Sequence, residues 1–167
     1  ADAADAVLAA LPDARFEIVA LVNSAGFGLR GRADELSRAD QIDLIDVNIR
    51  ALTALTLALL PRLKASRGKI LNLASVVAFM PGPGMAVYYA SKGYVLNFSE
   101  ALAQELKGTG VTVTTLCPGP VETAFWDRSG GAMDRLRALA PMSARQAAEA
   151  GVVAMLAGRR RATPGVL

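Results

Sequence analysis

The sequence of 167 residues contains no histidine and a single cysteine, Cys117. Without histidine, a Ser-His-Asp or Cys-His catalytic group is excluded, and one cysteine offers too few ligands for a zinc site. An internal disulfide is excluded as well, and Cys117 lies in an apolar stretch where we expect a buried structural thiol. Any acid-base chemistry must therefore come from Tyr, Lys, Asp, Glu or Ser, and we expect no metal.

Charge and long apolar runs are also scarce. The net charge is +3, and the most basic run, Arg159–Arg161, has no aromatic residues between its arginines, so we do not expect nucleic-acid binding. No uncharged apolar run approaches the roughly 20 residues that cross a bilayer, and the start of the chain lacks a secretory pattern. The length and the 53% hydrophobic content fit a single domain over residues 1–167 of a cytoplasmic protein without membrane contact.

Three short apolar runs have the composition of strands that are buried on both faces of a parallel sheet. They span residues 16–22, 69–74 and 111–117. Between them, a helix is predicted to start at Ser37, which forms a capping pattern with Asp40, and its apolar positions recur up to Leu59, before Pro61. Further helices are predicted over 3–11, 85–107 and 144–156. This alternation predicts an α/β fold with a doubly wound, Rossmann-like parallel sheet in three α/β/α layers.

One long irregular segment, residues 123–142, is typical of a lid over a binding site. It carries Phe125 and Trp126, which would contact the substrate and favour an apolar one. The same side chains could instead cover the core, and the sequence leaves both readings open.

The stretch Gly26–Gly31 matches G-x-G-x-x-G after a predicted strand, the pattern of a pyrophosphate loop. Such a loop should open a helix directly, whereas the helix signal here is Ser37. The pattern therefore favours a loop whose small residues pass close to another part of a ligand.

Tyr88 and Lys92 are four residues apart on a predicted helix, which places both side chains on one face. A nearby ammonium can lower the pKa of a phenol, which is needed because free tyrosine titrates near 10. Ser75 stands at the carboxyl end of a predicted buried strand, at the edge where open α/β sheets bind ligands. These three side chains are candidates for acid-base chemistry.

Five elements resemble the short-chain dehydrogenase/reductase family in order and spacing. They are Asn23–Gly26, Asn48, Ser75, Tyr88–Lys92 and Pro118–Thr123. The resemblance covers nearly the whole chain, with Ser24 in place of the family's second Asn. It implies an oxidoreductase that passes a hydride between NAD or NADP and a small carbonyl or alcohol substrate, in a homodimer or homotetramer.

The resemblance also implies residue roles. Tyr88 would donate and accept the proton, and Lys92 would bind the nicotinamide ribose and lower the pKa of Tyr88. Ser75 would hydrogen-bond the substrate carbonyl, Asn48 would hold a water of the proton relay, and Tyr89 would pack. The implied cofactor-binding residues are Asp2, Asn23, Ala25, Gly26, Tyr88, Lys92, Pro118, Gly119, Val121 and Thr123.

The family's first strand, its Thr-Gly-x-x-x-Gly-x-Gly loop and its second strand have no counterpart in the sequence. We therefore expect a fold without the first βαβ unit, and the residues that select NAD or NADP belong to that unit. The sequence could be an ordered part of a longer protein, a truncated protein, or a natural short relative without cofactor. The alternative to the enzyme is an inactive fragment or a non-catalytic interaction module, which would pair through helices 37–65 and 86–107.

Overall fold

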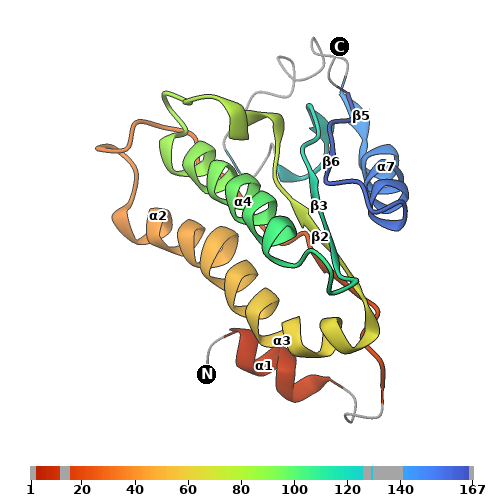
Figure 1. Cartoon of the computed structure of the whole chain (residues 1–167). Helices are drawn as coiled ribbons and strands as arrows, with labels where there is room; N and C mark the ends of the chain where they lie inside the picture. The colour runs from red at the N-terminus through yellow and green to blue at the C-terminus, as the bar shows by residue number, and fades with distance from the viewer. Residues whose placement is uncertain (1–2, 12–15, 126–128, 130–140, 166–167) are drawn as a thin grey trace.

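The computed structural model describes residues 3–11, 16–125, 129 and 141–165 (Figure 1). Its centre is a parallel sheet of strand order β1-β2-β3-β6. These strands are β1 (Ala20–Asn23), β2 (Lys69–Leu73), β3 (Thr112–Leu116) and β6 (Arg161–Ala162). A second parallel pair joins β4 (Val121–Glu122) to β5 (Met142–Ser143).

Helical segments connect the strands. They are α1 (Ala3–Ala10), α2 (Arg38–Ile45), the π-helix η1 (Asp46–Ala51), α3 (Leu52–Ser66), the 3-10 helix η2 (Val76–Phe79), α4 (Ala86–Glu105) and α7 (Ala144–Leu156). Ser37 caps α2 as predicted, with its hydroxyl accepting a hydrogen bond from the Asp40 backbone N–H at 3.3 Å.

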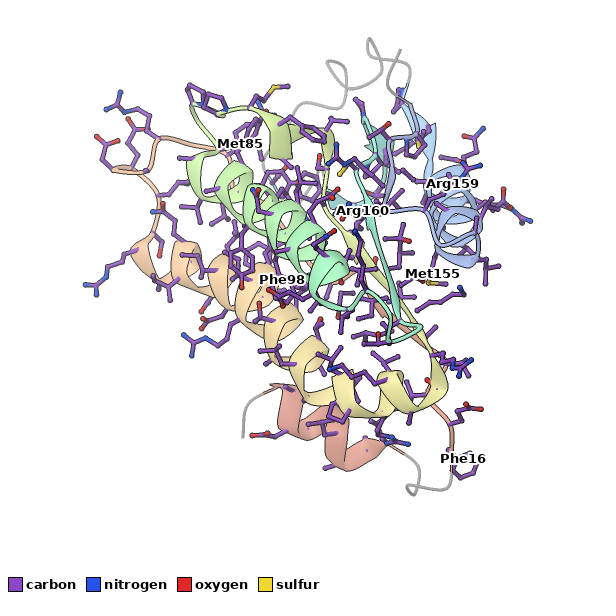
Figure 2. The ribbon with its side chains drawn as sticks, in the orientation of Figure 1. Phe16, Met85, Phe98, Met155, Arg159 and Arg160 are labelled. Atoms are coloured by element: carbon purple, nitrogen blue, oxygen red, sulfur yellow. The ribbon has the colours of Figure 1, made fainter. Side chains whose placement is uncertain are left out.

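Alternation along the strands creates two apolar faces, because successive strand side chains point to opposite sides of a sheet. Ile70 and Val113 pack in one cluster with buried leucines of α3 and α4. Leu71 and Leu116 pack on the other side with Met155 of α7, which Figure 1 and Figure 2 show across the sheet from α4. The predicted parallel α/β fold with helices on both faces is thus confirmed.

The first strand is shorter than the predicted run 16–22. Phe16 is 61% exposed, and pairing with β2 starts only at Ala20, opposite Lys69. β1 also forms one edge of the described sheet, where Val19 is 60% and Val22 52% exposed. An apolar run therefore marked the strand, while the partner strand determined where it begins.

The helix that starts at α2 runs through Pro61, in agreement with the predicted helix over 37–65. It continues to Ser66 and ends at Arg67, which adopts a left-handed conformation with φ 52°. Pro61 lies on the exposed side of α3, and Leu57, whose carbonyl loses its helical partner, is 53% exposed. Water can reach that carbonyl, which lowers the cost of the proline.

By length and composition alone, the stretch 38–66 could also cross a membrane, because the mean hydropathy of its most apolar window is 1.5, and 28% of that window is buried. One side of the stretch, with Leu52, Leu59 and Leu63, is buried in the core. A single helix of this kind is weak evidence for a membrane span, since the core helix of a soluble protein can meet the same criterion.

Candidate active site

A cavity of about 490 Å³ opens at the carboxyl ends of β2 and β3. Its wall combines apolar side chains of the sheet and of α7 with polar groups from the loops that follow the strands. Ligands of open parallel α/β sheets bind at this edge. The predicted residues that line the cavity are Gly26, Ser75, Tyr88, Lys92, Pro118, Gly119, Val121, Thr123 and Phe125.

Ser75 is placed by the end of β2. The chain leaves the strand after Leu73, and Ser75 becomes the N-cap of η2, its hydroxyl accepting a hydrogen bond from the Val77 N–H at 3.3 Å. The same hydroxyl opposes the rise in the pKa of the Tyr88 phenol. Ser75 and Tyr88 both line the cavity.

Tyr88 stands in the first turn of α4 between aromatic and basic neighbours. Its ring lies 5.1 Å from that of Phe125, centroid to centroid, and the Lys92 Nζ is 5.8 Å from its centroid. Burial raises the pKa of the Tyr88 phenol to about 12, against the smaller lowering effect of Ser75. Lys92 was expected to lower this pKa, but desolvation is the largest effect on it in this structure.

Lys92 is 6% exposed and donates a hydrogen bond to the Leu73 carbonyl at 2.9 Å. Burial lowers the pKa of its ammonium to about 8. An ammonium has three donors, and within the described part of the chain this one makes a single hydrogen bond. Lys92 can therefore donate to a ligand that enters the cavity.

Asn48 connects three elements of the site from beneath the cavity. Its side-chain amide donates to the Phe27 carbonyl and to the Ser91 hydroxyl, both at 3.0 Å, and accepts from the Phe27 N–H at 3.1 Å. Ser91 in turn donates to the Tyr88 carbonyl at 2.7 Å. Since both amide protons of Asn48 are used, a water in its reach would be held by its remaining oxygen acceptors.

The glycines of the loop 26–31 are needed for close contacts. A Cβ on Gly26 would lie 2.9 Å from the Asn48 Oδ1, and one on Gly28 would lie 3.2 Å from the Tyr88 ring and 2.7 Å from Phe125. The next helix starts only at Arg38. The loop thus passes close to the site and does not open a helix, as the position of the Ser37 cap predicted.

Asn23 is held in a buried hydrogen-bond network. Its amide donates to the Thr56 hydroxyl at 3.0 Å and to the Asn72 side chain at 2.8 Å, while Asn72 donates to Ser99 at 2.9 Å. This buried network ties β1 and β2 to α3 and α4. Asn23, Ala25 and Asn48 do not line the cavity. Their direct contact with a cofactor stays a prediction, and Asp2 and Trp126 lie outside the described residues.

Sequence reasoning did not select several residues of the wall, among them Arg30, Met85 and Val152. Tyr89, interpreted as a packing residue, covers Gly82 but also lines the cavity. For Arg30 a signal existed, because a charged side chain follows the glycines at the end of a strand. Val152 on α7 is more than 60 positions from Tyr88 in the chain, and only the fold brings them together.

Comparison with known proteins gives consistent results. A family model described as short chain dehydrogenase matches residues 1–133. Sulfoacetaldehyde reductase of Chromohalobacter salexigens is 42% identical over 134 residues, which cover 78% of this chain and 53% of that protein. Serine 3-dehydrogenase of Agrobacterium fabrum is 41% identical over 132 residues, with coverages of 78% and 53%.

Among solved structures, a short-chain dehydrogenase from Sphingobium yanoikuyae in complex with NADPH is similar, with a TM-score of 0.83 and 31% sequence identity. The match covers 96% of this chain and 62% of that one. The chain thus spans about half the length of the two curated relatives.

Proposed function

Since this chain belongs to the short-chain dehydrogenase family, we propose that the protein transfers a hydride between NAD or NADP and a small carbonyl or alcohol substrate. The observation that carries this proposal is the convergence of Ser75, Tyr88 and Lys92 on one cavity at the carboxyl edge of the sheet. An acid-base group, a second hydroxyl and a buried ammonium come from two separate elements to reach it.

The protonation state of Tyr88 favours one direction of the reaction. With its pKa at about 12, the phenol carries its proton at neutral pH, which is the state needed to protonate a carbonyl oxygen during reduction. Ser75, which lines the same cavity as the phenol, would donate to the same oxygen and stabilise the charge that develops there. For oxidation, the pKa of Tyr88 would first have to fall.

The residues present fit the nicotinamide-ribose half of the cofactor. Lys92 holds two further donors in a nearly dry position, suited to ribose hydroxyls, and Gly26 leaves beside it the space that a side chain would fill. Pro118, Gly119, Val121 and Thr123 supply the facing wall. When bound, the nicotinamide would supply or accept the hydride.

The assembly and location of the protein are part of the proposal. Exposed apolar side chains on α2, α3 and α4, namely Ile42, Leu57 and Tyr94, support self-association through these helices into a homodimer or homotetramer. We place the protein in the cytoplasm, with small molecules rather than nucleic acid or membranes as its partners.

Calorimetry with NADPH and NADH, followed by kinetics of Tyr88→Phe, tests the proposed reaction. Loss of the phenol proton should lower kcat by about 100- to 10,000-fold, with cofactor binding and folding retained. Tyr94→Phe is the matched control, because Tyr94 shares α4 but its hydroxyl pairs with Thr53 at 2.9 Å on the exposed side. Normal turnover by Tyr88→Phe would refute the assignment. A folded protein that binds neither cofactor would mean that these 167 residues are not an enzyme by themselves.

A further inference from the structure

Among the described residues of the cavity wall, Arg30 is the charged side chain that has no role in the proposed reaction. The described lining contains two basic side chains, Arg30 and Lys92, and neither Asp nor Glu. Lys92 is buried and donates a hydrogen bond to the Leu73 carbonyl, whereas Arg30 is exposed. In the described part of the chain its guanidinium forms no ion pair and no hydrogen bond, so its five donors are available to a ligand.

The backbone on either side of Arg30 is held in place. Phe27 is bonded to Asn48 through both its N–H and its carbonyl, and the Gly31 N–H donates to the Gly84 carbonyl at 2.8 Å. Gly31 has φ 150°, and a Cβ there would meet Leu36 at 2.8 Å. Arg30 is therefore presented by a fixed loop, which lowers the entropic cost of binding.

The position of the loop places Arg30 near Tyr88, within reach of the far end of a short substrate. Gly28 lies against the Tyr88 ring. Arg30 follows Gly28 by two residues, so the Cα atoms of Gly28 and Arg30 are at most about 7 Å apart. Gly84, to which the loop is bonded, precedes Met85, another residue of the cavity wall. A short substrate at Tyr88 would thus bring its far end within reach of the guanidinium.

We propose that Arg30 binds a carboxylate or sulfonate on the substrate, which makes the preferred substrate a short anionic aldehyde or alcohol. This inference rests on the proposed function. An arginine suits such groups because its planar donors match two of their oxygens. Two relatives are named for sulfoacetaldehyde and for serine. Both molecules have a single carbon between the reacting carbon and the acid group. The apolar residues that suggested an apolar substrate are, apart from Phe125, outside the described residues.

The test compares kcat/KM for anionic and neutral aldehydes of similar size. Sulfoacetaldehyde and 3-oxopropanoate are the anionic probes, and butanal is the neutral one. In Arg30→Gln the ratio of anionic to neutral kcat/KM should fall roughly 10- to 100-fold, the range of a hydrogen bond to a charged group. Arg30→Lys should lie between, since it keeps the charge but not the paired donors.

Arg32→Gln is the matched control on the same loop. Arg32 pairs with Asp34 at 3.0 Å and is not part of the cavity wall, so this variant should keep the wild-type ratio. A wild type that reduces butanal as well as the anionic probes would overturn the inference and leave the proposed function standing. Arg30→Gln could instead lower kcat/KM equally for all three aldehydes and also weaken NADPH binding. That result would overturn the inference too, since Arg30 would then serve the cofactor. A protein that binds NADPH but reduces none of these aldehydes, nor larger neutral ketones, would contradict both proposals.

Discussion

Replacing Lys92 by methionine should show how far the buried charge of Lys92 destabilises the folded protein. The ammonium is 6% exposed, and burial lowers its pKa from 10.5 to about 8. A lysine whose pKa is lower in the folded protein destabilises that fold wherever it is charged in the unfolded chain. Methionine has a similar length and carries no charge, so Lys92→Met removes this penalty together with the hydrogen bond to Leu73.

The size of the effect follows from the two pKa values. At about pH 7 the difference corresponds to about 3 kcal/mol of destabilisation in the wild type. The unfolded chain binds more protons than the folded one between about pH 8 and 10.5, so this penalty disappears as the pH rises through that window. The unpaired Leu73 carbonyl costs the variant about 1–3 kcal/mol at every pH. The variant should therefore match or exceed the wild type in stability near pH 7 and become the less stable protein near pH 10.

Urea unfolding of the wild type and of Lys92→Met at about pH 7 and about pH 9.5 measures the change. The stability difference between the two proteins should move by about 2 kcal/mol in favour of the wild type. Titration of Tyr88 affects both proteins alike and cancels in this difference, whereas the charge interaction between Cys117 and Lys92 is present in the wild type alone. Lys107→Met, which removes an exposed lysine, controls for net charge. A stability difference that does not change with pH, or changes in the other direction, would refute the account of Lys92 as a buried charge.

Two further substitutions test how the site is held. Gly119→Ala would place a Cβ 2.5 Å from the backbone oxygen of Gly165, so thermal unfolding should show a loss of about 1–3 kcal/mol, whereas Gly93→Ala, with its nearest neighbour at 3.7 Å, should cost nothing. An unchanged Tm for Gly119→Ala would contradict this packing. Ser91→Ala leaves one amide proton of Asn48 without an acceptor and should cost about 1–3 kcal/mol and lower kcat more than it raises KM, which steady-state kinetics would show. A KM effect alone would assign Ser91 to substrate binding instead.

The parts of the fold that the sequence predicted well are those with a local cause. β2 and β3 coincide with short apolar runs, and α7 has the predicted bounds because the Ser143–Gln146 capping box fixes its start. Catalytic candidates were found for the same reason. Tyr88 and Lys92 share one helix face, and Ser75 follows a strand directly, so spacing along the chain was sufficient.

What the sequence did not predict depends on contacts between distant segments. β6 has only two residues and no apolar run. It forms a strand because the backbone N–H groups of Thr115 and Cys117 donate hydrogen bonds to the carbonyls of Arg160 and Ala162. Arg160 and Arg161, which belong to the most basic run of the sequence, both pair with Glu100 of α4 and fix this strand. Figure 2 shows Arg160 beside α4, although this helix and Arg160 are far apart in the sequence.

The π-helix η1 (Asp46–Ala51) lies in a helix that the sequence predicts, but its irregular turn depends on a contact with a distant segment. Apolar periodicity continues through it, so the sequence predicts an unbroken helix there. In the structure, Asn48 is held by both backbone groups of Phe27, the residue between Gly26 and Gly28, and a π-turn admits the extra residue that this position requires. The same contact orders the loop that carries Arg30. An irregularity in one helix, invisible to periodicity, thus links the acid-base group at Tyr88, through Ser91, to the side chain that we infer selects the substrate.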